Sequence, residues 1–340
     1  MKRLAALALC ALLAAAPPGA AAAPPAKPPA AGGYAKRPEV KEFIREMAQR
    51  HGFVERELAF MFSRVKREES ILNSIRPPDK PRSWQEYRDL FLTEKRVALG
   101  IEFWAANRER LERAQHEYGV PAQYILAIIG IETYYGRNMG RWRVVDALTT
   151  LAFDYPPRSA YFRSELEQYL LLSRDLGFDV FSVRGSYAGA IGIPQFMPGS
   201  QRRFAVDFDG DGSIDLRRNS ADAIGSVGNF LKQHGWQAGG AVMFEAQVET
   251  DAARAYADGG IEPKHRLAEL RGVGARFTAP VELDTALGAL VELPTPSRAS
   301  EYRVGLNNFY VITRYNRSAF YASAVAELAS ALKKAQEAGR

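Results

Sequence analysis

Hydrophobic side chains recur at intervals of three and four residues along most of the chain, with charged residues between them. The stretches with this pattern are 40–67, 93–118, 160–175, 221–234 and 318–334. Such spacing gathers apolar side chains on one face of an amphipathic helix. Another helix is expected to start at Pro121, because proline suits the first helical turn, and a proline-rich break lies at 77–81. The sequence predicts a largely helical protein.

The pattern changes between about residues 241 and 301. Val, Thr and Phe occur there in short alternating runs that glycines and prolines interrupt, which is typical of short strands. The fold class predicted from the pattern is therefore mainly α with a small β insert. The helical segments on either side of the insert are expected to form one α body, to which the C-terminal helix returns.

The N-terminus has the pattern of an exported protein. Lys2 and Arg3 precede an apolar run at 4–16, and small residues and prolines follow it, as in a secretory signal peptide. The run is too short to span a bilayer as a stable helix. We expect a signal peptide at 1–23, a disordered Pro/Ala-rich linker at 24–37, and a periplasmic mature protein. Lipidation at Cys10, giving an outer-membrane lipid anchor, is the alternative.

Composition narrows the class of protein. With 340 residues, of which 47% are hydrophobic and 25% charged, the chain can bury a sizeable core and is long enough for two domains. Its single cysteine excludes a disulfide framework. The net charge of +6 favours an acidic partner such as nucleic acid, anionic lipid or an anionic wall polymer. Because the basic residues are scattered and no nucleic-acid-binding module is evident, no nucleic acid is expected.

Glu132 is the first candidate for chemistry. It continues the apolar stripe that includes Ile125 and Ile128, so its carboxyl group should be partly desolvated. Desolvation raises the pKa of a carboxylic acid, which can then hold its proton near neutral pH and deliver it to a leaving oxygen. The alternative from the residues alone is an ion pair between Glu132 and a nearby arginine such as Arg137 or Arg141.

A glycine-rich segment, GSYAGAIGIPQFMP at 185–198, is the second candidate. Glycines let a backbone approach a ligand closely, and the segment also carries hydroxyl and amide side chains. Its spacing is neither that of a phosphate-binding loop nor that of a dinucleotide fingerprint. By itself it is therefore only a weak signal of a binding site.

Four segments together resemble one known family. They are GIETYYG at 130–136, GSYAGAIGIPQFMP at 185–198, VDFDGDGSIDL at 206–216 and GLNNFYVITRYNRS at 305–318. In this order they are similar to the membrane-bound lytic transglycosylase B family of peptidoglycan enzymes. The resemblance runs from about residue 40 to the C-terminus. It implies a lysozyme-like α+β core with a flanking helical domain.

The resemblance also implies a division of the chain and a reaction. An N-terminal helical region is expected at 38–120, a catalytic core with an EF-hand-like loop at 121–240, a β-rich insert at 241–304, and a C-terminal motif and helix at 305–340. Family members cleave the β-1,4 bond between N-acetylmuramic acid and N-acetylglucosamine without water, which leaves a 1,6-anhydromuramoyl end. Ordinary glycosidases need two carboxylates, whereas this family uses one, which corresponds to Glu132, and no catalytic cofactor. Asp146 and Asp154 remain candidates for a carboxylate that assists Glu132. The alternative is that each is a helix cap or a surface acid.

Other family positions map onto this chain one by one. By resemblance, a hydroxyl and an amide beside the acid hold the N-acetyl group, a basic residue meets lactyl or peptide carboxylates, and tyrosines and an asparagine line the sugar groove. These residues are Ser186, Gln195, Arg158, Tyr87, Tyr161, Tyr315, Asn316 and Tyr321. The chain departs from the family at Phe230, where tyrosine is usual, and at Pro157, where a second basic residue is usual.

The segment 207–218 has the spacing of a calcium-binding EF-hand loop. The residues at its ligand positions are Asp207, Asp209, Asp211, Ser213 and Asp215. Position 12, normally a bidentate Glu, is Arg218. The resemblance implies a longer loop whose last acid comes later, and Asp222 is the candidate, so we expect structural Ca²⁺ bound by Asp207, Asp209, Asp211, Ser213 and Asp222. An Asp/Gly turn without metal is the alternative.

The predicted function is a peptidoglycan lytic transglycosylase. A hydrolytic muramidase is the alternative enzyme, and a non-catalytic wall-binding protein is the alternative of another class. The expected partners are peptidoglycan glycan strands, with cell-wall synthesis enzymes as candidates, and the protein is expected to act as a monomer.

Overall fold

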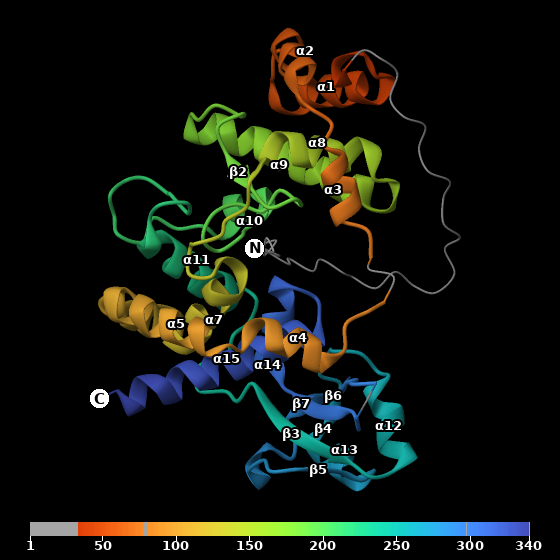
Figure 1. The fold of residues 1–340 in the computed structure, drawn as a ribbon, viewed down its shortest axis with the longest axis vertical. Coiled ribbons are helices and arrows are strands. Elements are labelled where there is room, and N and C mark those ends of the chain that lie inside the picture. The colour runs from red at the N-terminus through yellow and green to blue at the C-terminus, as the bar shows by residue number, and fades with distance from the viewer. Residues whose placement is uncertain (1–32, 78–79, 297, 340) are drawn as a thin grey trace, which may run out of the picture. The chain divides into compact units, whose positions relative to one another are not determined.

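The computed structural model describes residues 33–77, 80–296 and 298–339. The predicted signal peptide, Cys10 and most of the predicted linker lie outside these residues. The chain forms two compact units (Figure 1): the first includes the described parts of Ala16–Pro77 together with Met139–Arg203, and the second includes those of Pro78–Asn138 and Phe204–Arg340. Both units combine separate pieces of sequence. The division therefore differs from the boundaries expected at 120 and 240, because local patterns do not show which distant segments pack together.

The first unit is mostly helical. Its elements are η1 (Tyr34–Lys36), α1 (Pro38–His51), α2 (Glu55–Arg64), α3 (Glu69–Ser74), β1 (Trp142–Arg143), α8 (Val144–Asp154), η2 (Pro156–Arg158), α9 (Ser159–Leu176), β2 (Arg184–Gly185) and α10 (Pro198–Phe204). The periodic stretch 40–67 becomes α1 and α2, separated by Gly52, whose left-handed backbone (φ 69°) ends α1. Glycine adopts this conformation without strain.

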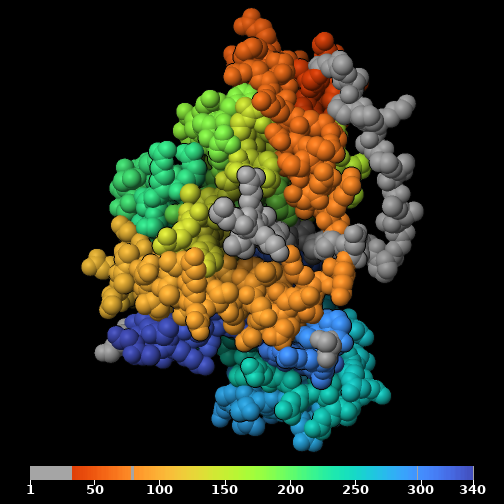
Figure 2. Space-filling view, in the orientation of Figure 1, coloured from red at the N-terminus to blue at the C-terminus, as the bar shows by residue number. Residues whose placement is uncertain are grey.

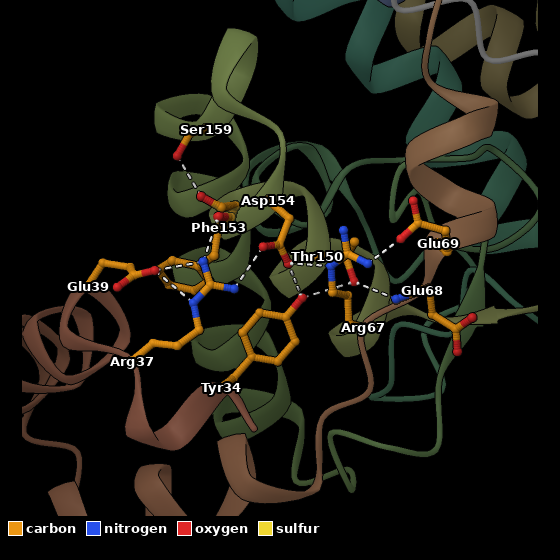
Figure 3. Close-up of polar contacts among 11 residues, drawn as sticks. Tyr34, Arg37, Glu39, Arg67, Glu68, Glu69, Thr150, Phe153, Asp154 and Ser159 are labelled. Atoms are coloured by element: carbon orange, nitrogen blue, oxygen red, sulfur yellow. Dashed lines mark hydrogen bonds and ion pairs between the residues drawn. The ribbon is translucent and has the colours of Figure 1, made fainter. Parts of the chain in front are cut away.

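The end of the predicted linker is ordered, which corrects the expectation of disorder up to residue 37. Tyr34 begins η1 and is 4% exposed. Its hydroxyl donates to Asp154 Oδ2 at 2.5 Å, and Arg37 Nη1 donates to Asp154 Oδ1 at 2.8 Å (Figure 3). Burial, reinforced by the Asp154 carboxylate, raises the pKa of Tyr34, so its hydroxyl stays a donor. The proline and alanine content of the linker predicted weak packing, but Tyr34 and Arg37 at its end both form hydrogen bonds with Asp154.

Asp154 is the centre of this network. It is the last residue of α8, and its side chain is 5% exposed. Arg67 Nε lies 3.5 Å from the same carboxylate, and Arg37 Nη2 also donates to Phe153 O at 2.9 Å (Figure 3). A buried charge is tolerated when it is paired and hydrogen-bonded in this way. Asp154 therefore fixes the N-terminal segment to α8.

The second unit is built around a buried helix. Its helices are α4 (Trp84–Phe91), α5 (Glu94–Ala106), α6 (Arg108–Tyr118), α7 (Ala122–Thr133), α11 (Ser220–Gln233), α12 (Asp251–Ala257), α13 (Leu267–Gly272), η3 (Val281–Leu283), α14 (Asn307–Tyr315) and α15 (Ala319–Ala338). Helix α7 is buried on every side from Ile125 to Thr133. The C-terminal helix α15 packs against α7, α5 and α4, and Figure 2 shows α15 (blue) along the orange surface of α4 and α5.

A small antiparallel sheet completes the second unit. Its strands are β3 (Met243–Val248), β4 (His265–Arg266), β5 (Ala275–Phe277), β6 (Leu287–Leu293) and β7 (Glu301–Gly305), in the order β4-β6-β7-β3-β5. In the central pairs, Val304 of β7 lies opposite Phe244 of β3 and Leu290 of β6. Val304 and Leu290 pack with Leu267 and Leu270 of α13. These strands occupy the stretch in which the sequence predicted a strand-containing insert.

The predicted fold class, mainly α with a small β insert, is confirmed. The sequence pattern did not single out α8, which is buried along most of its length. Within the part of the chain that the structure describes, no helix is both long and apolar enough to span a membrane.

Replacing Asp154 by Asn keeps the size of the side chain but removes the charge that faces Arg37 and Arg67. Because two guanidinium groups then lose a buried partner, we expect the free energy of unfolding to fall by about 3 kcal/mol in urea denaturation. Glu69→Gln is the control, since Glu69 also contacts Arg67 but is exposed, and it should cost less than about 1 kcal/mol. Equal effects of the two variants would contradict the role given to burial.

Candidate active site

Glu132 lies near the end of the buried helix α7, and its side chain is largely withdrawn from solvent, with 8% exposed. The predicted burial is confirmed. Helix α7 starts at Ala122 with Pro121 in the preceding capping position, one residue later than predicted. Because the last nine residues of this helix, Ile125 to Thr133, are all buried, the carboxyl group lies at a site with little access to water.

Tyr321 of α15 donates a hydrogen bond to Glu132 Oε1 at 2.6 Å. The tyrosine is 1% exposed, and its ring stacks on that of Tyr315 with the centroids 6.4 Å apart. Burial, followed by the charge of Glu132, raises the pKa of Tyr321 well above its ordinary value of 10. The hydroxyl therefore remains protonated and serves as a fixed donor that orients the Glu132 carboxyl group.

The chain turns sharply directly after this helix. Tyr134 (φ 56°) and Tyr135 (φ 60°) both have left-handed backbones, which are strained for residues with a Cβ atom. The side chain of Tyr135 fills a socket between two glycines: an added Cβ would lie 2.5 Å from the Tyr135 hydroxyl at Gly100 of α5 and 2.6 Å from it at Gly130 of α7. The absence of side chains at these two positions thus makes room for the ring that ends α7.

Other predicted groove residues of the second unit belong to aromatic clusters. Tyr87 is buried, and its ring packs against those of Phe91 and Phe320 at centroid distances of 5.0 and 5.6 Å. Phe230, at the position where the family has tyrosine, packs on Tyr315 at 4.8 Å. The substitution therefore keeps an aromatic ring beside Tyr315 but removes a hydroxyl group.

Asn316 follows α14 and is buried, and its Oδ1 atom has no hydrogen-bond partner among the described residues. A buried amide oxygen without a donor is costly. It is therefore a candidate acceptor for an N–H group of a ligand.

The alternative partners proposed for Glu132 are engaged elsewhere. Arg137 lies 3.6 Å from Glu102, and the Arg141 guanidinium lies 4.7 Å from the ring centroid of Trp142. Within the first unit, Asp146 accepts hydrogen bonds from Arg143 Nε and from the backbone of Lys66. Asp146 and Asp154 are therefore both members of structural networks, in which their side chains are 3% and 5% exposed.

Ser186 and Gln195 lie in the glycine-rich segment of the first unit. Ser186 Oγ accepts a hydrogen bond from Ala190 N at 3.0 Å, and two isolated bridges, Gly185 with Ile191 and Ile191 with Phe196, fold the segment back on itself. An added Cβ at Gly185 would lie 2.2 Å from Ala190 O. Glycine is therefore required for this tight fold.

Gln195 has a left-handed backbone (φ 52°) and is buried. Its Nε2 atom donates to Gly192 O at 2.8 Å and to Met139 O at 3.3 Å. Its Oε1 atom has no hydrogen-bond partner among the described residues. The amide group is thus held by its nitrogen and presents an acceptor oxygen.

Arg158 and Tyr161 lie at the start of α9 in the first unit. The Arg158 guanidinium lies over the Tyr161 ring, 4.5 Å from its centroid, and over the Phe162 ring at 5.3 Å. Pro157 belongs to the short helix η2 that leads into this pair. The cation–π contact holds the arginine against the tyrosine.

The structure thus places the predicted residues in two groups, one in each unit. The second unit holds Glu132, Tyr87, Tyr315, Asn316 and Tyr321, and the first unit holds Ser186, Gln195, Arg158 and Tyr161. In the second unit, Tyr321 connects two of these residues: it donates a hydrogen bond to Glu132, and its ring stacks on that of Tyr315.

The acidic loop of the second unit gathers three carboxylates. Asp207, Asp209 and Asp211 each offer an oxygen within 4.8 Å of the others. Oxygens that share one Ca²⁺ at about 2.3–2.6 Å lie at most about 5 Å apart, so this group fits a hard cation. The backbone of Ser213 donates to Asp211 Oδ1 at 2.8 Å, which fixes the direction of that carboxylate.

Asp222, which the sequence analysis placed among the calcium ligands, lies outside the group of three carboxylates. It is fully buried, and its two oxygens accept hydrogen bonds from the backbones of Phe208 and Asp215, both at 2.8 Å. Burial raises the pKa of Asp222, and the charges of Asp209 and Asp207 raise it further. Asp222, in the first turn of α11, therefore holds the loop against this helix by accepting hydrogen bonds from the loop backbone.

The comparisons with known proteins agree with this arrangement. Residues 35–330 match the model of the transglycosylase SLT domain. The chain belongs to this family. It is 40% identical to membrane-bound lytic murein transglycosylase B of Escherichia coli strain K12 over 315 residues, which cover 90% of this chain and 85% of the relative.

Solved structures of family members show the same fold. The soluble lytic transglycosylase SltB1 of Pseudomonas aeruginosa has a TM-score of 0.82 and 47% identity, and the match covers 88% of this chain and 100% of SltB1. The Escherichia coli lytic transglycosylase Slt35, solved in complex with calcium, has a TM-score of 0.80 and 40% identity, and the match covers 90% of this chain and 96% of Slt35. The lysozyme-like fold class is confirmed, and the chain is a peptidoglycan lytic transglycosylase.

Sequence reasoning missed several residues that shape this family member's site. Tyr135 and its socket at Gly100 and Gly130 set the end of α7, and Arg96 lies over the ring of Tyr134. In the sequence, the adjacent tyrosines of GIETYYG are part of a family motif but give no sign of this geometry. Neither a left-handed backbone nor a contact between α5 and α7 leaves a periodic signal in the sequence.

Replacing Gly130 by Ala tests the socket. Alanine favours a helix over glycine by about 1 kcal/mol, but its Cβ would overlap Tyr135, and overpacking typically costs about 1–3 kcal/mol. We expect urea denaturation to show a net loss of stability. Gly272→Ala is the control, because Gly272 ends α13 and has open space around it, so it should leave stability unchanged or slightly higher. A Gly130→Ala protein as stable as the wild type would contradict the socket.

Proposed function

We propose that Glu132 is the single acid/base of a non-hydrolytic cleavage of peptidoglycan between N-acetylmuramic acid and N-acetylglucosamine. The observation that carries this proposal is the buried Glu132 carboxyl group with the Tyr321 hydroxyl fixed on one of its oxygens. Three other carboxylates with little exposed side chain belong to structural networks: Asp146 and Asp222 accept hydrogen bonds from backbone amides, and Asp154 pairs with Arg37.

The reaction proceeds in two steps at this carboxyl group. Protonated Glu132 gives its proton to the glycosidic oxygen, and the bond from that oxygen to C1 of the muramic acid breaks. The resulting carboxylate then takes the proton of the C6 hydroxyl while that oxygen forms a bond to C1. Glu132 ends protonated and no water is consumed. An attacking group on the same sugar has a high effective concentration, which explains how one carboxylate suffices.

The remaining predicted residues would bind the saccharide. N-acetyl groups carry an N–H donor, and the buried oxygens of Gln195 and Asn316 are acceptors without partners among the described residues. Ser186 lies in the same loop as Gln195 and would contribute its hydroxyl group. Arg158 would meet lactyl or peptide carboxylates, with Tyr161 beneath it.

The tyrosines would contribute less directly. Tyr315 and Tyr321 would act as one stacked pair, in which Tyr315 supports the residue that orients Glu132. Tyr87 would line the sugar groove together with the rings of Phe91 and Phe320 that pack against it. A hydrolytic muramidase would use the same acid but deliver water to C1, and a wall-binding protein would need no acid at all.

Location and partners are further proposals from the sequence. The predicted signal peptide would carry the chain into the periplasm, where peptidoglycan lies, and the relative from Escherichia coli is named as membrane-bound. Action as a monomer on glycan strands, with cell-wall synthesis enzymes as candidate partners, and lipidation at Cys10 stay predictions.

Replacing Glu132 by Gln should abolish turnover while leaving binding of glycan strands intact. Loss of a general acid/base typically lowers the rate about 10²–10⁴-fold. Digestion of purified sacculi followed by mass analysis of the products measures both the rate and the chemistry, because an anhydro end is lighter by one water than a reducing end. Glu102→Gln, which alters an exposed glutamate, is the control and should digest sacculi like the wild type. Activity of the Glu132 variant, or reducing-end products from the wild type, would contradict the proposal.

We further propose that the acidic loop binds structural Ca²⁺ through Asp207, Asp209 and Asp211, with Ser213 as a further predicted ligand, while Asp222 holds the loop backbone. The close carboxylates support a cation, which would relieve their mutual repulsion. The loop is attached to the helical body by Phe208, which packs on the backbone of α11 at Gly225. Bound Ca²⁺ would therefore stiffen the connection between the loop and α11, and it would supply no step of the reaction.

Calcium should raise the thermal unfolding temperature of the purified protein, and a chelator should lower it. A ligand at 100 times its dissociation constant stabilises by about 2.7 kcal/mol. Asp211→Asn should reduce this response, whereas Asp251→Asn, which alters an exposed acid outside the loop, should keep it. An unfolding temperature that does not respond to calcium would rule out the site.

A further inference from the structure

Arg96 is a buried cation that the proposed reaction does not use. It lies in the first turn of α5 and is 7% exposed. Its Nη1 donates to Leu90 O at 2.5 Å, and its Nε has no hydrogen-bond partner among the described residues. Burial lowers the pKa of its guanidinium group, and the side chains that oppose this shift are Tyr134 and Tyr135 rather than a carboxylate. A buried charge without an ion pair is costly.

The place of Arg96 in its own helix adds to this cost. The N-terminal end of a helix carries partial positive charge, so a cation in the first turn of α5 is unfavourable there. Thr93 caps this helix by accepting a hydrogen bond from Arg96 N at 3.2 Å, which requires only the backbone of residue 96. The local structure of α5 therefore gives no reason for an arginine side chain.

The reason lies in the turn that follows Glu132. The Arg96 guanidinium lies between two rings, 4.5 Å from the centroid of Tyr134 and 5.1 Å from that of Phe91. Desolvated cation–π contacts can contribute about 2 kcal/mol. Tyr134 is the residue that ends α7, and its backbone is left-handed. The C-terminal end of a helix also carries partial negative charge, so the Arg96 guanidinium group near the end of α7 stabilises it.

We propose that Arg96 is a positioning residue for Glu132. By stacking on Tyr134, it holds the strained turn at the end of α7, and this turn sets the direction of the Glu132 carboxyl group two residues earlier. The inference rests on the proposed role of Glu132 in catalysis. Tyr135 fixes the same turn from its glycine socket, and Tyr321 fixes the carboxyl group itself.

The test compares activity with stability. Arg96→Met replaces the charge by an apolar chain of similar length, so the thermal unfolding temperature should stay the same or rise. We expect kcat on purified glycan strands to fall about 10- to 100-fold while KM changes by less than about twofold. Arg108→Met removes an exposed arginine at the start of α6 and should leave kcat and KM unchanged. Wild-type kcat in Arg96→Met would overturn the proposal.

A double-mutant cycle shows whether Arg96 acts through Tyr134. Tyr134→Gly removes the ring but tolerates the left-handed backbone. If the two side chains act as one unit, the double variant Arg96→Met/Tyr134→Gly should lose no more kcat than the more impaired single variant. Losses that multiply would overturn the proposed route.

Two further variants keep the test decisive. If Arg96→Met does not fold, Arg96→Lys takes its place: it keeps the charge but loses the flat guanidinium group, so a lowered kcat at unchanged KM supports the proposal and a wild-type kcat overturns it. Glu132→Gln separates the two hypotheses. If it stays active, the proposed function fails, whereas an inactive Glu132→Gln with a fully active Arg96→Met overturns only the role of Arg96.

Discussion

The hydrogen bond from Tyr321 to Glu132 joins the C-terminal helix α15 to the buried helix α7, across 189 residues of sequence. It depends on the close packing of these helices, and the chemistry proposed for Glu132 depends on it. A carboxyl group buried without a donor would be costly, and one exposed to water would be free to turn. The tyrosine removes both problems, because its raised pKa keeps its proton in place as a donor.

How much of this could be predicted from the sequence depends on the range of the interaction. The helices α1, α2, α5, α6, α9, α11 and α15 follow from local periodicity. In the structure, Asn219 and Ser318 also cap the starts of α11 and α15. Glu132 could be found because its apolar neighbours lie one helical turn away. The partners Tyr34 and Asp154, 120 residues apart, could not, because their contact depends on how distant segments pack.

Two predictions depended on contacts that the sequence does not show. Asp222 was placed in the metal site by the family resemblance, yet both of its oxygens accept backbone hydrogen bonds from the loop. A buried carboxylate can satisfy a loop as well as ligate an ion, and only the direction of its oxygens distinguishes the two roles. The linker prediction extended to Arg37 for a similar reason. Composition describes an average, whereas the single pair of Arg37 with Asp154 decides where order begins.

Strain and function coincide at the residues with left-handed backbones. Among the described residues, those other than glycine are Tyr134, Tyr135 and Gln195, and they lie in the two segments that carry Glu132 and Ser186. Each such position costs about 1–2 kcal/mol, and glycine would adopt the same backbone without strain. Glycine at these positions would lack three side chains. They are the Tyr135 ring that fills the socket between α5 and α7, the Tyr134 ring on which Arg96 stacks, and the Gln195 amide, whose nitrogen is hydrogen-bonded and whose oxygen has no partner among the described residues. These side chains therefore justify the strain, since each holds or presents a group that the bare turn could not.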